Sequence, residues 1–410
     1  MRICLITWIN RQVGGVETYL SKVIPELARA GSEVGFWYEK DSSPDREPIS
    51  LQMAKRTWGV EQIGRDRALA GLRDWQPDVL YSHGLLDPEL EAQILEVAPA
   101  VFFLHSYYGT CISGAKTFKN PTIRPCDCRF GWPCLLRYYP RRCGGWSPLS
   151  MVREYQRQHD RLELLTRYKA ILTHSGHMVD EYAAHGLRVR QIAWPAEENF
   201  ELPARSTPAL EKAEPFSHPS TPWRLLFVGR MDLLKGGRIL LQALPRVVDI
   251  LKRPVCVVFA GDGPDRGAWE RISLRLSSEQ PDVTFRFVGW RSAEELTNLL
   301  DNADLLVLPS LWPEPFGQVG IEAGHRAVPV AAFAVGGINE WLIDGVNGRL
   351  AAGDPPTAEG LTDAIASCLS DPETHFRLRR GALEIAQRFS MKQHLAELLP
   401  VLEETAQYAS

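Results

Sequence analysis

The stretch that decides the fold runs from Leu311 to Val330 and reads LWPEPFGQVGIEAGHRAVPV. It follows an apolar run from Asp304 to Ser310, which predicts a strand buried on both faces of a parallel sheet. A helix is expected from about Gly317 to Gly324. The first N–H groups of a helix have no partner within the helix, and the helix dipole adds positive potential there. A strand that leads into a helix start therefore predicts an anion site.

Two carboxylates stand eight residues apart in this stretch. Glu314 lies in the loop before the expected helix, and Glu322 lies about one and a half turns into it. Carboxylates are good acceptors for the hydroxyl groups of sugars and riboses. A diphosphate at the helix start would put Glu314 at one end of a nucleotide-sugar and Glu322 at the other. Taken singly, each is as readily an ordinary loop or helix acid.

Length and composition indicate a water-soluble chain with two domains. The 410 residues can bury two sizeable cores, and the net charge of −4 gives no general attraction to nucleic acid. No apolar run approaches the roughly 18 residues that a membrane span needs. The N-terminal apolar segment is too short for a signal peptide and enters a strand pattern directly. We therefore expect a cytoplasmic protein.

The same strand–loop–helix plan occurs twice along the chain. Ile3 to Trp8 predicts a strand, the pair Gly14 and Gly15 a loop, and Glu33 to Tyr38 the next strand after a helix. Residues 201–222 hold five prolines and few large apolar side chains, which indicates a linker. Arg224 to Gly229 then starts a second unit of the same kind.

The second unit opens on Val-Gly-Arg230-x4-Lys235-Gly. Together with the Glu-x7-Glu stretch, this pattern resembles the retaining family-4 glycosyltransferases. The resemblance covers nearly the whole chain and implies the α/β GT-B fold, with two Rossmann-like domains facing each other across a cleft. It also implies transfer of a sugar from a nucleoside-diphosphate sugar to an acceptor hydroxyl with retention. UDP-sugars are slightly favoured over GDP-sugars, and the expected pathways are polysaccharide, glycolipid or glycoconjugate biosynthesis.

The resemblance also sets the expected domain boundaries. They are residues 1–200 for an N-terminal acceptor domain with a Cys-rich insertion at 111–143, 201–222 for the linker, 223–388 for a C-terminal donor domain, and 389–410 for a last helix that packs back on the N-terminal domain.

Four residues are the expected catalytic set. Arg230 and Lys235 would neutralise the charge that grows on a diphosphate leaving group, although basic loop residues are more often simply solvated. The resemblance places Glu314 and His105 at the transferred sugar. The residues expected to bind the donor are Gly14, Gly15, Gly289, Trp290, Phe316, Gly317, Gln318 and Glu322.

No catalytic metal is expected, because the two cations and the helix start can neutralise a diphosphate and no Asp-x-Asp motif is present. Glycosidase chemistry by two opposed carboxylates fits less well, since Glu314 and Glu322 flank a phosphate-type helix. Two other functions remain open: a nucleotide-sugar epimerase and a non-catalytic nucleotide-sugar binding protein. Turnover with donor and acceptor would separate them.

Five of the eight cysteines fall within 33 residues: Cys111, Cys126, Cys128, Cys134 and Cys143. Four of them, Cys111, Cys126, Cys134 and Cys143, would suffice for a structural zinc ion. The spacing is not that of a standard Cys-x-x-Cys pair, so disulfides and reduced thiols are alternatives, with disulfides disfavoured in the cytosol.

The segment around these cysteines is basic and aromatic. Residues 111–170 contain twelve Lys or Arg against four Asp or Glu, a local charge of +8. Within 124–146 the aromatic residues include Phe130, Trp132 and Trp146. This composition predicts an acceptor-side patch for an anionic lipid carrier, a phosphorylated acceptor or a peripheral contact with the inner face of a membrane. A nucleic-acid partner is not expected.

Overall fold

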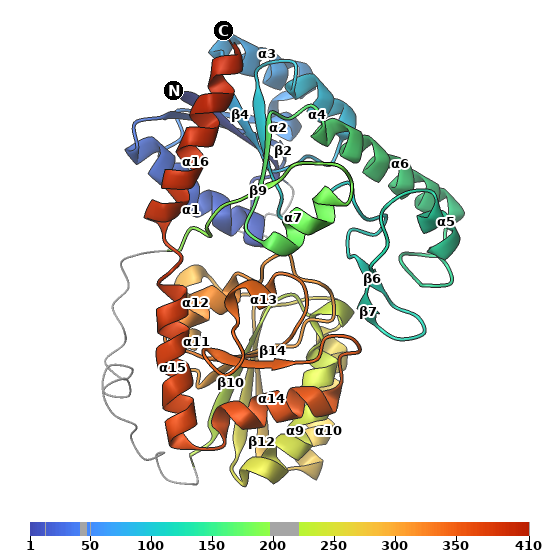
Figure 1. Ribbon diagram of the computed structural model, residues 1–410, viewed down its shortest axis with the longest axis vertical. Coiled ribbons are helices and arrows are strands. Elements are labelled where there is room, and N and C mark those ends of the chain that lie inside the picture. Colours follow the sequence, from blue (N-terminus) through green and yellow to red (C-terminus); the bar gives the residue numbers. More distant parts are fainter. Residues whose placement is uncertain (13, 42–46, 50, 197–220, 410) are drawn as a thin grey trace. The chain divides into compact units, whose positions relative to one another are not determined.

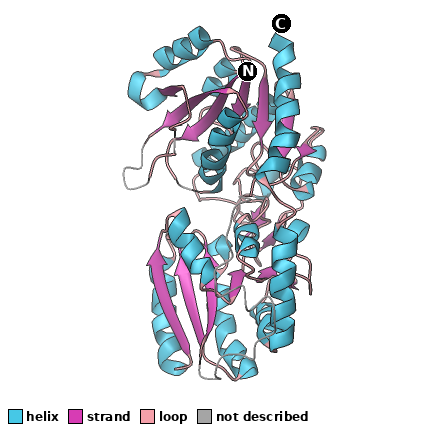
Figure 2. Ribbon diagram, turned by 90° about the vertical axis from the view of Figure 1, so that its left-hand side faces the viewer, coloured by secondary structure: helices cyan, strands magenta, loops and turns pink. Residues whose placement is uncertain are grey.

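The computed structural model describes residues 1–12, 14–41, 47–49, 51–196 and 221–409. These residues form two compact units. The first comprises residues 1–115, 127–195 and 390–410, and the second comprises 116–126 and 196–389. Most of the expected linker lies outside the described residues. Both units are Rossmann-like, which confirms the predicted fold class, and Figure 2 shows strands with helices on either side in each unit.

The first unit is built on a seven-stranded parallel sheet of order β3-β2-β1-β4-β5-β8-β9. Its elements are β1 (Arg2–Ile9), α1 (Gly15–Arg29), β2 (Glu33–Lys40), β3 (Arg56–Gly59), α2 (Val60–Ile63), α3 (Arg65–Trp75), β4 (Val79–Ser82), α4 (Pro88–Ile94), β5 (Ala100–Phe103), α5 (Pro133–Arg137), α6 (Pro148–Leu165), β8 (Ala170–Thr173), α7 (Gly176–Ala183), β9 (Arg190–Gln191), α16 (Met391–Ala406) and a 3-10 turn, η2 (Gln407–Ala409).

The second unit has a six-stranded parallel sheet of order β12-β11-β10-β13-β14-β15. Its elements are the short antiparallel pair β6 (Thr117–Phe118) and β7 (Arg124–Pro125), then β10 (Trp223–Val228), η1 (Leu233–Lys235), α9 (Gly237–Leu251), β11 (Val255–Ala260), α10 (Arg266–Glu279), β12 (Val283–Gly289), α11 (Ala293–Asp301), β13 (Leu305–Leu308), α12 (Val319–His325), β14 (Val330–Phe333), α13 (Ile338–Trp341), β15 (Gly348–Ala351), α14 (Ala358–Leu369) and α15 (Pro372–Ala386).

Continuous apolar runs account for the central strands. All four residues of β4, β5 and β13 are buried, as expected for parallel strands covered by helices on both faces. Helix α1 buries Tyr19, Val23 and Leu27, which recur every four residues, so one face of the helix lies on the sheet. Among the described residues, no helix is long and apolar enough to cross a bilayer.

The last helix, α16, belongs to the first unit (Figure 1). Its buried residues His394, Leu398 and Leu402 are spaced by four and lie on one face. The helix contacts β4 and β5. The Glu397 carboxylate also accepts a hydrogen bond from the backbone N–H of Ala193, at 2.7 Å. The chain therefore passes through the second unit and ends on the first.

The expected Cys-rich insertion is divided between the units. Residues 116–126, which include β6 and β7, group with the second unit, whereas residues 127–143 group with the first. Arg124 lies 3.8 Å from the carboxylate of Asp354, in the same unit. No pattern in the sequence predicts this division, because the segment has the composition of one uninterrupted polar loop.

The strand orders locate the ligand-binding edge of each sheet. In both units the first strand lies between the second and the fourth of the main sheet, and the order reverses there. Loops at such a reversal point run away from each other and leave a crevice at the carboxyl ends of the strands. The reversal lies between β1 and β4 in the first unit and between β10 and β13 in the second.

Candidate active site

The second unit brings its predicted catalytic residues to this reversal point. Arg230 follows β10, and residues 310–314 follow β13, which pairs directly with β10. Their loops therefore leave the same edge of the sheet. Three of the predicted residues, Arg230, Lys235 and Glu314, stand on these two loops.

A short 3-10 turn sets the direction of Lys235. The Asp232 carboxylate accepts hydrogen bonds from the backbone N–H groups of Leu234 and Lys235, at 3.0 and 3.2 Å. Gly236 ends the turn with a φ of 70°. A Cβ atom at this glycine would lie 1.7 Å from the carbonyl oxygen of Pro309. The turn thus packs directly against the end of β13, and only glycine fits there.

Lys235 and Glu314 form an ion pair between the two loops. The distance from Lys235 Nζ to Glu314 Oε1 is 2.5 Å, and the Glu314 side chain is 9% exposed. The Ser310 hydroxyl donates to the same oxygen, also at 2.5 Å. The Lys235 ammonium lies 5.3 Å from the centre of the Trp312 ring, within range of a cation–π interaction. A positive and a negative group are therefore held together in a partly dehydrated setting.

Arg230 is placed differently. Its side chain is 72% exposed, and its nearest ion-pair partner is the carboxylate of Asp232, at 3.6 Å from Nε. The guanidinium is thus solvated and can reorient, which suits a group that closes on an anionic ligand. Its expected role, neutralising a diphosphate together with Lys235, stays a prediction.

Backbone contacts fix the loop that carries Glu314. The Glu314 carbonyl accepts a hydrogen bond from the Gly337 N–H at 2.7 Å. Gly336, with a φ of 56°, leaves no room for a side chain, because a Cβ atom would lie 2.2 Å from the same carbonyl oxygen. The Trp341 indole N–H donates to the Phe316 carbonyl at 2.7 Å. Phe316 is itself 6% exposed and its ring contacts that of Phe389, and its role in donor binding stays a prediction.

Helix α12 begins two residues later than expected. Gln318 is its N-cap residue, and Gly317 before it has a φ of 81°. Glu322 is half-buried and lies within the first turn, not one and a half turns in. Its carboxylate is therefore closer to the start of the helix than the sequence suggested.

Gly289 and Trp290 stand apart from the other predicted donor residues. They lie at the end of β12, which is two strands away from β10. The Gly289 carbonyl accepts a hydrogen bond from the Gly261 N–H at 2.7 Å, and Trp290 is 37% exposed. This contact links the end of β12 to the Gly-rich loop after β11. A role in donor binding stays a prediction.

In the first unit, Gly14 and Gly15 stand at the start of α1, as expected. The Gly14 N–H donates to the carboxylate of Glu17 at 2.7 Å, and Glu17 is almost fully buried. This contact closes the helix start on itself. The amide of one of the two glycines expected to bind the donor is thus already used within the chain.

His105 forms a pair with His83 at the carboxyl ends of β5 and β4. The distance from His83 Nδ1 to His105 Nε2 is 2.9 Å. Three buried polar atoms at the neighbouring strand ends have no hydrogen-bond partner among the described residues: Thr7 Oγ1, Asn10 Oδ1 and His83 Nε2. Buried polar atoms are nearly always paired, and those that are not call for an explanation.

Burial keeps the histidines at this edge uncharged. It lowers the pKa of His83 to about 3, with smaller contributions from His174 and His394. Desolvation likewise lowers the pKa of His105 and of His174 well below the usual range, and that of His394 to about 4. Neutral imidazoles can donate from one ring nitrogen and accept at the other.

A network of hydrogen-bonded side chains lies beside the histidine pair, since the Tyr19 ring contacts both His83 and His105. The Tyr19 hydroxyl contacts the Tyr81 hydroxyl and lies 3.0 Å from His394 Nε2. His394 Nδ1 lies 2.7 Å from the Ala193 carbonyl oxygen, so it carries the proton. His394 Nε2 then accepts from Tyr19. Helix α16 is in this way joined to α1 and to β4.

The cysteines predicted as zinc ligands occupy both units. Cys111 and Cys143 are buried, and Cys126 and Cys134 are partly exposed. Cys126 belongs to the second unit and the other three to the first. The zinc site stays a prediction.

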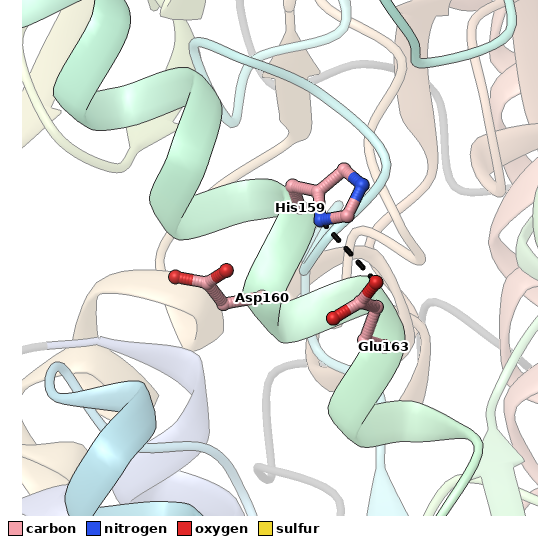
Figure 3. Close-up of side chains that lie close together, drawn as sticks. All are labelled: His159, Asp160 and Glu163. Atoms are coloured by element: carbon pink, nitrogen blue, oxygen red, sulfur yellow. Dashed lines mark ion pairs between the residues drawn. The ribbon is translucent and has the colours of Figure 1, made fainter.

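A separate group of potential metal ligands lies on α6: His159, Asp160 and Glu163. All three are exposed, and His159 Nδ1 lies 3.6 Å from the Glu163 carboxylate one helical turn away. Figure 3 shows the three side chains on α6, and one potential ligand atom of each lies within 4.8 Å of the other two. This arrangement is an ordinary pair on a solvated helix face, and we assign it no site.

The sequence alone does not point to several residues around the site. Ser310 shares Glu314 with Lys235, Asp232 sets the turn, and His394 completes the network under the histidine pair. Ser310 and Asp232 stand next to the predicted motifs. A hydroxyl or carboxylate beside a loop turn could therefore have been predicted to contact the site residues. No local signal marks His394, which lies 375 residues from its partner Tyr19.

Comparison with known proteins agrees with this architecture. The family model described as "Glycosyl transferases group 1" matches residues 210–384. Glycogen synthase of Mycobacterium tuberculosis H37Rv is 36% identical over 423 aligned residues, which cover 93% of this chain and 89% of that protein. D-inositol 3-phosphate glycosyltransferase of Saccharomonospora viridis is 35% identical over 189 residues, 44% of this chain and 42% of that protein. The chain thus matches less than half the length of the latter relative.

Solved structures share the fold over the full length. Anabaena HepE in complex with UDP-glucose superposes with a TM-score of 0.67 at 19% identity, covering 98% of this chain and 99% of that one. Sucrose-phosphate synthase of Thermosynechococcus elongatus gives a TM-score of 0.67 at 20% identity, with complete coverage of both. The family model and the long match to glycogen synthase show that the chain belongs to the glycosyl transferases group 1 family, and the solved structures show that it has the GT-B fold.

Proposed function

We propose that this protein is a retaining glycosyltransferase that moves a sugar from a nucleoside-diphosphate sugar to an acceptor hydroxyl. The pathway would be polysaccharide, glycolipid or glycoconjugate synthesis. The observation that carries the proposal is the Lys235–Glu314 pair at the reversal point of the second sheet, with the exposed Arg230 on the adjoining loop. UDP is the favoured nucleotide, since HepE is known in complex with UDP-glucose.

The two cations match the chemistry of a diphosphate leaving group. As the bond between the anomeric carbon and the phosphate oxygen breaks, negative charge grows on the diphosphate. A guanidinium can bind two phosphate oxygens at once, and an ammonium acts as a compact charge. Groups already positioned for this charge stabilise the transition state without reorganisation cost. No catalytic metal is then required.

Glu314 is arranged to bind sugar hydroxyls. Both of its recorded side-chain contacts use Oε1, and Oε2 makes no hydrogen bond to a described residue. This oxygen can accept from a hydroxyl of the transferred sugar. Glu322, on α12, would bind the ribose. The acceptor oxygen attacks from the face that the diphosphate leaves, and its proton passes to the departing phosphate oxygen, so no protein nucleophile is needed.

The histidine pair supports a polar ligand at the edge of the first sheet. The three unpartnered atoms of Thr7, Asn10 and His83 would gain partners from hydroxyl groups. His105 would contact the transferred sugar, and its lowered pKa keeps it a neutral hydrogen-bonding group rather than a cation.

The proposal is tested by incubating the purified protein with a panel of UDP- and GDP-sugars and candidate acceptors. Release of the nucleoside diphosphate is measured, and the anomeric configuration of the product is read by NMR. A retained configuration is expected. An inverted product would refute the mechanism. Isomerised donor without acceptor would indicate an epimerase, and tight donor binding without turnover a binding protein.

A further inference from the structure

Exposed apolar side chains are concentrated in one segment of the first unit. Five of the fourteen large apolar side chains that are exposed among the described residues fall within residues 132–152, and they have exposed fractions of 45 to 78%. They are Trp132, Leu136, Trp146, Leu149 and Val152, and we name them the Trp–Leu surface. Scattered exposed apolar residues are normal, but a gathered set marks an interaction site.

Helical spacing groups these residues. Trp132 is the N-cap residue of α5, and Leu136 follows four residues later on the same side. Leu149 and Val152 are three residues apart at the start of α6. Trp146 stands just before α6. The two helices contact each other (Figure 1), so their exposed apolar pairs come from adjoining elements.

Positive charge accompanies the Trp–Leu surface. Residues 128–153 contain five arginines and no lysine, aspartate or glutamate. Arg142 lies over the Trp146 ring, with its guanidinium carbon 5.7 Å from the ring centre, and Tyr139 stacks on the same indole. Tryptophan with arginine is the combination found where proteins meet the headgroup region of a bilayer.

We propose that the Trp–Leu surface docks the protein on an anionic lipid bilayer. The indole and leucine side chains would enter the headgroup boundary, while the arginines bind acidic headgroups. This placement builds on the proposed function by naming a lipid surface as the side from which an acceptor arrives. An anionic bilayer is preferred over a neutral one, because the arginines are attracted to acidic headgroups. Apolar side chains alone would bind both kinds of bilayer.

Vesicle sedimentation tests the proposal without donor or acceptor, so its outcome is separate from that of the transfer reaction. Vesicles of phosphatidylcholine alone are compared with vesicles that also contain phosphatidylglycerol. The wild-type protein should bind the anionic vesicles at least tenfold more tightly, and salt should weaken the binding. Equal binding to both vesicle types, or no binding to either, would overturn the proposal.

Variants locate the contact. Leu136→Ser with Leu149→Ser should reduce binding about tenfold or more. Arg137→Gln with Arg153→Gln should also reduce it, by roughly fivefold per arginine. The control is Leu274→Ser with Ile250→Ser, which removes exposed apolar residues of the second unit and should leave binding unchanged. Equal losses in control and test variants would refute the assignment. A wild-type dimer in sedimentation velocity that the Leu136 and Leu149 changes dissociate would instead assign the surface to a second copy of the chain.

Discussion

At the residue scale, Arg230 and Lys235 are the two cations proposed to neutralise the diphosphate. The Lys235–Glu314 pair makes their substitutions distinguishable by experiment. Arg230→Ala removes an exposed side chain, so the fold should keep its stability while transfer falls by roughly 10²-fold or more. Lys235→Ala should lower transfer similarly but also leave a buried carboxylate without its cation, which destabilises a protein strongly. Steady-state kinetics and thermal denaturation check both expectations. Near-normal turnover in both variants would refute the proposed role of Arg230 and Lys235 in neutralising the diphosphate.

The double variant Lys235→Ala with Glu314→Gln provides the matched control. Removing both charges takes away the unpaired carboxylate, so stability should recover toward that of the wild type, whereas activity should not. If the double variant is as unstable as Lys235→Ala, the ion pair is not the reason for the loss.

Glu314 and Glu322 should affect the binding of different parts of the donor. Glu322→Gln should weaken binding of free nucleoside diphosphate and of nucleotide-sugar alike, because both contain the ribose. Glu314→Gln should spare the free nucleotide and impair binding or use of the sugar donor. An unpaired hydroxyl in a closed site costs about 1–3 kcal/mol. Calorimetry with both ligands decides the matter, and equal losses for free nucleotide would refute the division.

At the element scale, α16 carries the histidine that joins the chain end to the first sheet. The sequence predicted this helix, but a hydrogen bond between Tyr19 and His394 could not be predicted from local patterns. The same holds for Lys235 and Glu314, which are 79 residues apart. Phe316 was expected from its place in the loop to bind the donor. The structure shows its ring against that of Phe389 and its carbonyl accepting from the Trp341 indole N–H, and the donor role stays a prediction.

The buried histidines should make stability depend on pH. In the unfolded chain each binds a proton near pH 6.5, whereas the folded pKa is about 3 for His83 and about 4 for His394. The unfolded state thus binds more protons between these limits. Stability is complete above about pH 6.5 and falls as the pH drops, by up to about 1.4 kcal/mol per pH unit for each histidine.

Urea titrations between pH 7.5 and 5 measure this slope. His394→Gln should reduce it, since one proton-binding difference is removed. Identical slopes in the wild type and in His394→Gln would show that His394 does not contribute.

At the scale of the whole molecule, the strand alternation and the two Rossmann-like units followed from apolar runs and Gly-rich loops. The strand order, which locates both reversal points, did not, because it depends on pairing between distant strands. The division of residues 111–143 between units was equally hidden, since a polar loop contains no periodic pattern to show where it packs.

Transfer should survive EDTA, because the proposed mechanism assigns charge neutralisation to Arg230 and Lys235. The measurement is nucleotide release with and without chelator, together with circular dichroism to show that the protein stays folded. An absolute requirement for added Mg²⁺ or Mn²⁺ would contradict the expectation. Elemental analysis of protein purified without a His tag tests the predicted zinc separately.

The Lys235–Glu314 pair has a kinetic consequence for the approach of the donor. Because the carboxylate already balances the ammonium, Lys235 contributes little net field at a distance, and the solvated guanidinium of Arg230 is left to attract an incoming anion. Salt screens exposed charges most strongly. In stopped-flow experiments, added salt should therefore slow nucleotide association in the wild type, and Arg230→Ala should lose most of that dependence. Lys235 would act only after arrival, when the diphosphate takes the place of its internal counter-ion.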